Sequence, residues 1–287
     1  MKKFFMFAAV AMLGLSIAFA SAGNSASAII LGDDDDDRPR FGKKLVEVPV
    51  VFQAAGSNRD SILSSVDAFR NRLGALNPNV PGSFGTGRRE INWDGVPDNF
   101  AAPNNFPPDF FNVNSPRGAV FSTPGAALQV SADNNNPTNT PVRFANINPA
   151  YADIFATFSP QRLFTAIDSN VSETLFFVPG TDTPATVSGF GAVFTDVDLP
   201  AGNNRGRARP STRIEFFDAE GRLLFVSDVP SSPGSASLSF LGVVFPTQRI
   251  ARVRITSGNV VLEGADGGRR DVVAMDDFIY GEPSAAQ

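Results

Sequence analysis

The chain contains no cysteine and no histidine, and these two absences exclude several kinds of site at once. Without cysteine there can be no disulfide, no thiolate nucleophile and no cysteine-bound zinc. Without histidine there can be no Ser-His-Asp triad and no zinc bound through imidazole. Carboxylates, hydroxyls and arginines are the groups that remain for chemistry, and the fold must be held together by its core.

Lysine is scarce, and all four lysines lie before residue 45. The rest of the chain therefore has no amine for a Schiff base or a Ser-Lys dyad. The formal net charge is −5, and removal of Lys2 and Lys3 would lower it to −7. The short arginine clusters at 205–209 and 269–270 lie among glycines and a proline, which predicts solvated loops. We therefore expect no nucleic-acid partner.

Only one long hydrophobic run is present, over residues 4–19, directly after Lys2 and Lys3. It is too short and too rich in small residues for a stable membrane span, and small-x-small cleavage patterns follow it. We predict that residues 1–22 are a secretory signal peptide, with a single membrane anchor as the alternative. We expect a secreted mature chain without a transmembrane anchor.

Residues 23–44 are dominated by five consecutive aspartates at positions 33–37. Blocks of like charge repel one another and stay extended. We therefore predict an acidic, disordered linker that serves as a solvated spacer, with weak attraction for calcium as the alternative.

The full chain is 43% hydrophobic and contains 27 Phe, 25 Gly and 22 Pro. This composition supports a large core and many turns. Short β-patterned segments separated by turn residues follow from residue 118 onward, and the segment 218–221 is the clearest hairpin turn. We predict an all-β fold, a jelly-roll-type β-sandwich whose body is residues 118–287.

One segment, residues 57–74, has the spacing of a helix. Ile62, Val66, Phe69 and Leu73 recur every three or four residues and form one apolar stripe. We predict a helix that packs on the sandwich. A proline-rich loop follows it, so residues 45–117 form a helix-plus-loop segment packed on the sandwich body.

The last expected strand, residues 272–280, contains two adjacent aspartates, Asp276 and Asp277. Strand alternation turns at least one of these carboxylates toward the core. An unpaired buried carboxylate is strongly unfavourable, so it needs a cation, an arginine or several backbone N–H groups. If both faces of the strand are covered, both carboxylates need such a partner.

Residues 87–98 offer two ways to neutralise that carboxylate. Calcium binds carboxylate and amide oxygens, and we predict a calcium site formed by Glu90, Asn92, Asp94 and Asp277. The alternative is a bidentate pair with an arginine, Arg88 or Arg89. The residue types leave both open.

The only tryptophan, Trp93, lies in the same stretch. Exposed beside a groove it would be a binding residue that stacks on a sugar, whereas buried it would be a core anchor. A long proline-rich connection keeps one shape only if something holds it. We therefore expect residues 87–98 to pack against the last strand with Trp93 largely buried.

A second acidic pair, Asp196 and Asp198, has the spacing that places both carboxylates on the same side of a strand. A proline and a glycine follow at positions 200 and 202, so we predict a solvated strand end. The alternative is that two like charges so close form a calcium site or have a raised pKa.

Several segments together resemble a group of bacterial exported proteins of unassigned activity: residues 87–98, 112–118, 121–125, 240–243 and 276–278. The later strands are similar to the jelly-roll domains of PEP-CTERM-type proteins and of carbohydrate-binding modules. In such modules a calcium ion often ties the first and last strands, which the resemblance would assign to Glu90 or Asp94 with Asp277. The residues after Glu282 depart from the PEP-CTERM pattern, so the resemblance does not extend to its sorting anchor.

These observations lead us to expect a secreted, non-enzymatic binding or surface domain, associated with a glycan or extracellular matrix and stabilised by calcium. An extracellular polysaccharide is the expected partner. One alternative is a glycoside hydrolase that uses two carboxylates among Glu90, Asp94, Asp196 and Asp198. The other is a purely structural component of a surface layer or biofilm.

Overall fold

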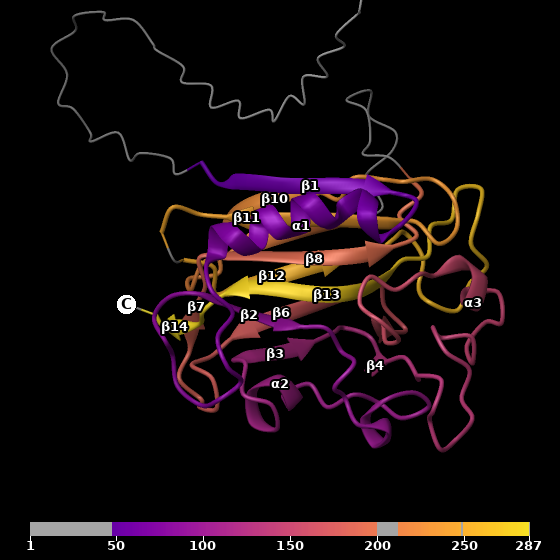
Figure 1. The fold of residues 1–287 in the computed structure, drawn as a ribbon, viewed down its shortest axis with the longest axis horizontal. Coiled ribbons are helices and arrows are strands. Elements are labelled where there is room, and N and C mark those ends of the chain that lie inside the picture. The colour runs from indigo at the N-terminus through magenta and orange to yellow at the C-terminus, as the bar shows by residue number, and fades with distance from the viewer. Residues whose placement is uncertain (1–47, 200–211, 248, 287) are drawn as a thin grey trace, which may run out of the picture. The chain divides into compact units, whose positions relative to one another are not determined.

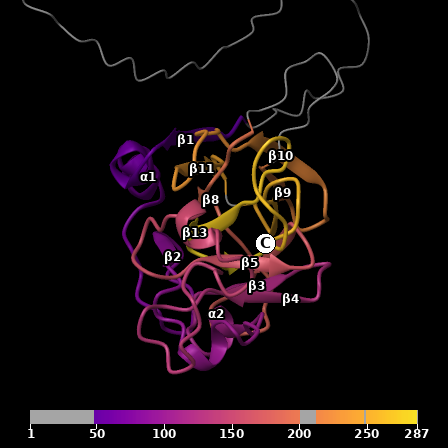
Figure 2. The same cartoon turned by 90° about the vertical axis from the view of Figure 1, so that its right-hand side faces the viewer.

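A computed structural model describes residues 48–199, 212–247 and 249–286, which belong to one compact unit, Val46–Gln287. The expected signal peptide (1–22), the linker (23–44) and the arginine cluster at 205–209 lie outside the described residues. Two antiparallel β-sheets pack face to face in this unit (Figures 1 and 2). The predicted all-β sandwich with one packing helix is confirmed.

The first sheet has seven strands and the second has five. The first sheet has the order β1 (Val50–Gly56), β11 (Leu238–Val244), β8 (Gly189–Thr195), β13 (Ala274–Gly281), β5 (Phe164–Ile167) and β4 (Ala127–Val130), and β2 (Arg88–Ile91) also pairs with β13. The second has the order β10 (Leu223–Asp228), β9 (Arg213–Phe217), β12 (Arg252–Thr256), β6 (Val171–Phe176) and β3 (Ala119–Ser122). Two short strands, β7 (Ala185–Thr186) and β14 (Ser284–Ala285), pair with each other.

The core between the sheets is built mainly from phenylalanines and β-branched residues. Phe190, Phe194 and Phe278 of the first sheet meet Phe176 and Phe216 of the second in one buried cluster. The predicted hairpin turn at 218–221 joins β9 to β10. From β5 onward the chain crosses repeatedly from one sheet to the other, as in a jelly-roll-type sandwich.

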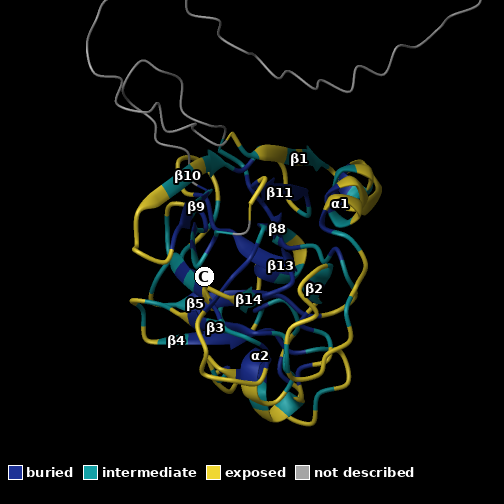
Figure 3. Cartoon of the chain, turned by 90° about the vertical axis from the view of Figure 1, so that its left-hand side faces the viewer, coloured by how far each residue is buried: buried dark blue, intermediate teal, exposed yellow. Residues whose placement is uncertain are grey.

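Helix α1 (Arg59–Leu73) covers the other face of the first sheet (Figure 2). The apolar stripe predicted from the sequence is buried there, and Asn58 caps the helix by accepting a hydrogen bond from the Ser61 amide. Gly242 allows this close packing, because a Cβ atom at that position would lie 2.7 Å from the Phe69 ring. Both faces of the first sheet are therefore covered, and β8, β11 and β13 are buried along their whole lengths (Figure 3).

The segment 45–117 does more than pack on the sandwich, because β1 and β2 are strands of the first sheet. The loop that follows β2 contains a 3-10 helix, η1 (Asp98–Phe100), and a short helix, α2 (Phe110–Val113). A third short helix, α3 (Tyr151–Ile154), lies between β4 and β5. None of the helices in the described ranges is long and apolar enough to cross a membrane.

Candidate functional site

The stretch 87–98 lies against β13, as the sequence predicts. Strand β2 pairs antiparallel with the second half of β13, with Ile91 opposite Phe278 and Arg88 opposite Gly281. The partner strand lies almost two hundred residues later in the chain. This pairing brings the acidic and basic groups of both segments together.

Trp93 lies two residues after the end of β2 and has no exposed surface. Its ring stacks on Phe164 with a centroid distance of 4.2 Å, and Phe106, Phe111, Phe121 and Phe278 contact it from other sides. Its Nε1 donates a hydrogen bond of 2.8 Å to the Asp276 carbonyl. A fully buried ring cannot stack on a sugar, so the binding role suggested for Trp93 is wrong. The expectation of a buried core anchor is confirmed.

Arg89 is buried at the same place and forms a bidentate pair with Glu282. Its Nε donates to Glu282 Oε2 at 2.6 Å and its Nη2 to Glu282 Oε1 at 2.8 Å. The same guanidinium also donates to the backbone carbonyls of Pro78, Gly82 and Pro116. The arginine pair that the sequence left open therefore exists, but its carboxylate is Glu282 and not Asp277.

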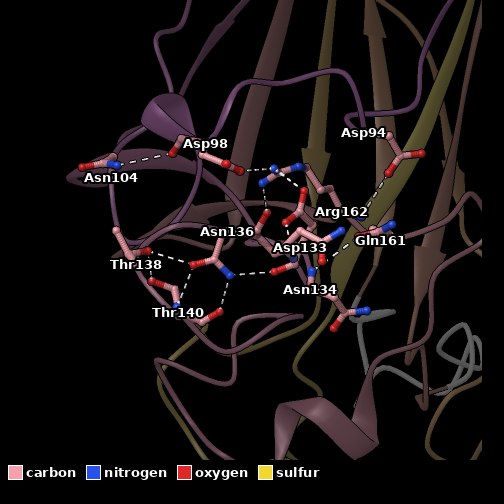
Figure 4. A network of polar contacts seen from close by, with 12 residues as sticks. Asp94, Asp98, Asn104, Asp133, Asn134, Asn136, Thr138, Thr140, Gln161 and Arg162 are labelled. Atoms are coloured by element: carbon pink, nitrogen blue, oxygen red, sulfur yellow. Dashed lines mark hydrogen bonds and ion pairs between the residues drawn. The ribbon is translucent and has the colours of Figure 1, made fainter.

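A second buried arginine, Arg162, holds the loop that follows β2 (Figure 4). Its Nη2 contacts Asp98 at 2.6 Å and Asp133 at 2.7 Å. Its Nη1 donates to the Ser131 carbonyl, and its backbone N–H donates to Asp94 Oδ1 at 3.1 Å. Asp94 and Asp98 are thereby tied to the chain around residue 131, which fixes the proline-rich connection.

The turn around Asp133 is itself fixed by side-chain amides (Figure 4). Asn136 Nδ2 donates to the carbonyls of Asp133 and Thr140, and its Oδ1 accepts from the Thr140 amide and the Thr138 hydroxyl. These bonds hold the backbone of the turn whose carboxylate contacts Arg162. The network is a structural clamp, which the sequence analysis did not identify.

Asp277 lies beside Arg70, a residue of the last turn of α1. Arg70 donates two hydrogen bonds to Glu90, at 3.0 and 2.9 Å, and its Nη2 lies 3.4 Å from Asp277 Oδ2. The other Asp277 oxygen is buried and has no hydrogen-bond partner in the structure. Burial raises the pKa of Asp277 to about 6, while the Ser159 hydroxyl and the charge of Arg70 oppose that rise.

Asp276 is fully buried, and it lies with Asp277 in a β-bulge of β13. The pairing with β8 shifts by one residue between Met275 and Phe278, so regular alternation is broken there. Asp276 accepts hydrogen bonds from the Phe158 amide and, at 3.1 Å, from the Ser159 hydroxyl. Burial and the charge of Asp277 raise its pKa well above the ordinary value.

The four predicted calcium ligands are not gathered around one ion. Glu90 uses both oxygens to accept from guanidinium groups, those of Arg70 and Arg88. Asp94 accepts from the Arg162 amide, and the Asn92 side chain is exposed. Glu90 and Asp277 meet around the Arg70 guanidinium, and Asn92 lies in the same cleft, whereas Asp94 is directed to Arg162.

A polar cleft of about 510 Å³ opens beside this arrangement. Its lining includes Asp277 and Glu90 together with several donor side chains: Arg59, Asn77, Asn79, Asn92 and Arg117. Arg117 is held in place because its Nε donates to the Glu90 carbonyl at 2.9 Å and its guanidinium lies over the Phe111 ring. The cleft therefore combines fixed and free hydrogen-bond donors on one surface.

A separate cluster of carboxylates, Asp196, Asp198 and Asp266, could hold a metal ion. One oxygen from each lies within 4.8 Å of the other two. Asp196 follows β8 and has no exposed surface, and neither of its carboxylate oxygens has a hydrogen-bond partner in the structure. Burial, with the charges of Asp266, Asp198 and Asp271, raises the pKa of Asp196 to about 8.

The predicted solvated strand end is therefore wrong for Asp196, which is fully buried and has the raised pKa of the alternative. The strand end is covered because residues of the loop before β13 lie over it. Asp266 belongs to this loop, and nothing in its local sequence marks it as a partner of Asp196. Sequence reasoning missed it because the two are joined only by the fold.

Comparison of the chain with protein-family models, curated proteins and solved structures finds no match.

Proposed function

We propose that the chain is a secreted, non-enzymatic domain that binds an extracellular polysaccharide, with calcium as a stabilising ion. The observation that supports this most is the polar cleft beside α1 and β2. Polysaccharides present rows of hydroxyl groups, which accept hydrogen bonds from amide and guanidinium donors. The cleft offers donors of both kinds.

Three side chains in the cleft are available to a ligand. Asn79 and Asn92 are exposed and make no side-chain hydrogen bonds to other described residues. Arg59 forms no ion pair within the described part of the chain, and its guanidinium lies 5.1 Å from the centre of the Phe158 ring. Arg59 projects from α1 and Asn92 lies immediately after β2, so binding would order these side chains but not the backbone that carries them.

The loop that lines one side of the cleft also carries exposed apolar side chains. Leu76 lines the cleft and is 56% exposed, and Phe84 of the same loop is 49% exposed. The Phe84 ring is held over the buried guanidinium of Arg89 at 5.4 Å. Phe84 is not among the residues that line the cleft, but an exposed ring held in one orientation can pack on the apolar face of a sugar that extends along this loop.

The carboxylates of the cleft favour binding over hydrolysis. A glycoside hydrolase needs a protonated acid and a second carboxylate that both face the substrate. Glu90 is held by two guanidinium groups, and Asp277 is only 2% exposed despite its raised pKa. Neither carboxylate is placed to reach a glycosidic bond.

Binding can be tested by co-sedimentation with insoluble polysaccharides and by affinity electrophoresis in gels that contain soluble neutral or acidic polysaccharides. We expect retention by at least one polysaccharide, and we expect the variant Arg59→Ala/Asn92→Ala to bind at least tenfold more weakly. Arg72→Ala is the matched control, because Arg72 is exposed on the same helix but does not line the cleft. Absence of binding to every polysaccharide would refute the proposal, and ordered self-association would favour a structural surface component.

A further inference from the structure

We propose that Asp196, Asp198 and Asp266 form a binding site for one calcium ion. This site is separate from the polysaccharide cleft, and the inference does not depend on the proposed function. The carboxylates come from the end of β8 and from the loop that precedes β13.

The spacing of the three carboxylates suits a single ion. One oxygen of each lies within 4.8 Å of the other two. Calcium binds oxygen ligands at about 2.3–2.6 Å, so two ligands on opposite sides of one ion are about 5 Å apart. The separation of the three oxygens is therefore compatible with coordination of one ion.

The charge of the cluster requires a partner. None of the three carboxylates forms an ion pair with an arginine in the described parts of the chain. Asp196 is fully buried, one of its oxygens faces the other two carboxylates, and both of its oxygens lack a hydrogen-bond partner. A buried carboxylate without donors is strongly unfavourable, and a divalent cation supplies both the charge and the coordination that are missing.

The two outer carboxylates are held in place by backbone amides. Gly234 N–H donates to Asp198 Oδ1 at 2.9 Å, and Val272 N–H donates to Asp266 Oδ1 at 3.2 Å. These bonds orient the side chains but leave the negative charge of the cluster uncompensated. Ser237, whose carbonyl accepts a hydrogen bond from the Asp196 amide, adds a buried hydroxyl that also has no partner in the structure.

The chemistry of the cluster favours calcium among divalent cations. All the available ligands are oxygens, which hard cations prefer, and the chain has no cysteine or histidine to select zinc. Asp198 and Asp266 are partly exposed, so water can complete the six to eight ligands that calcium takes. Magnesium demands a stricter octahedron and gives up its water reluctantly.

The test uses the full chain, freed of metal with a chelator and dialysed. Calorimetric titration with calcium chloride is expected to show one ion bound per chain, and thermal unfolding is expected to shift to higher temperature as calcium rises. Asp196→Asn and Asp266→Asn should each weaken calcium binding at least a hundredfold. Glu263→Gln is the matched control, because Glu263 is an exposed acid of the same loop as Asp266.

The result can also separate this site from the one expected at Glu90 and Asp277. Asp277→Asn should leave calcium binding unchanged, so loss of binding in that variant would overturn the assignment. The weakest extracellular calcium modules have dissociation constants of about 1 mM. The absence of both binding heat and a shift in the unfolding temperature at calcium concentrations up to about 10 mM would therefore refute the site. An equal response to magnesium would refute the choice of ion. If Asp196→Asn fails to fold, calcium binding by Asp266→Asn still tests the site, because Asp266 is partly exposed. Unchanged polysaccharide binding by Asp266→Asn would show that the calcium site and the polysaccharide cleft act independently.

Discussion

Two regions of the first sheet bury carboxylates, and they neutralise them in different ways. Where β2 meets β13, Glu282 is paired with Arg89, and Glu90 is paired with Arg70 and Arg88. At the end of β8, Asp196 is equally buried but has no donor within the described residues. The first region carries its compensating charge in the chain, whereas the second needs a proton or a cation from solvent.

This difference explains why the two regions should respond oppositely to mutation. A buried ion pair becomes costly when one partner is removed, because the remaining charge is left without compensation. A buried carboxylate that has no partner is already costly, so its removal relieves the fold unless an ion is bound. The structure therefore predicts changes of opposite sign in the free energy of unfolding.

The largest effect is expected for Arg89→Ala. The substitution leaves Glu282 buried without its guanidinium and frees three backbone carbonyls, so we expect the free energy of unfolding to fall by about 3–5 kcal/mol. Urea unfolding measures the change. Arg72→Ala, an exposed arginine of α1, is the control and should change stability by less than about 0.5 kcal/mol. A loss for Arg89→Ala as small as that of the control would contradict the buried pair.

A smaller change of opposite sign is expected for Asp196→Asn in the presence of a chelator. Because the pKa of Asp196 is raised to about 8, the folded chain holds a proton at pH 7 that the unfolded chain releases. Between the ordinary pKa of 3.8 and pH 7, at roughly 1.4 kcal/mol per pKa unit, this requirement costs about 4 kcal/mol, and the buried Asn amide costs about 1–2 kcal/mol in its place. The substitution should therefore raise the free energy of unfolding by about 2–3 kcal/mol. In saturating calcium the same variant should be less stable than the wild type. Equal stability of the two proteins in both conditions would show that Asp196 is neutralised by the chain itself.

The elements of the fold that depend on local pattern were predictable from the sequence. The helix α1 and its buried face were predictable because they depend on local spacing alone. Apolar residues recur every three or four positions at Ile62, Val66, Phe69 and Leu73. Alternation and turn residues likewise gave the hairpin at 218–221. The burial of Trp93 was predictable because a long proline-rich connection needs an anchor.

The pairing of charges was not predictable, because it depends on contacts between distant segments. Arg89 and Glu282 are 193 positions apart, and either arginine of β2 could have taken the carboxylate. Nothing in the local sequence around Arg162 indicates that it will contact Asp94, Asp98 and Asp133. The bulge at Asp276 and Asp277 also breaks the alternation from which their directions were inferred.

A third prediction concerns the contribution of Asp277 to the pH dependence of the free energy of unfolding. Burial raises its pKa from 3.8 to about 6, so the folded state binds a proton more tightly than the unfolded state. The resulting stability is fully present below about pH 4 and is lost as pH rises through about 6. We expect Asp277→Asn to remove this decline, which amounts to about 2–3 kcal/mol at roughly 1.4 kcal/mol per pKa unit. Urea unfolding between pH 4 and 7 measures it, with the exposed Asp109→Asn as control. Parallel pH profiles for the wild type and Asp277→Asn would refute the prediction.

The smallest effect is expected at an ion pair that resembles the buried one in chemistry but lies on the outer face of the second sheet. Glu173 accepts hydrogen bonds from Arg252 and, at 2.7 Å, from Arg254 across the β6–β12 pairing. All three side chains are 20–42% exposed, so water and salt screen their charges. Arg252 also lies 4.0 Å from the centre of the Phe217 ring, which keeps it in place without the carboxylate.

Glu173→Gln should therefore lower the free energy of unfolding by about 0.5 kcal/mol, and the loss should vanish in about 1 M sodium chloride, where screening acts within about 3 Å. Urea unfolding at low and high salt measures both quantities. If Glu173→Gln cost as much as Arg89→Ala, burial would not be what separates these pairs, and the contrast between the two regions of the first sheet would need another cause.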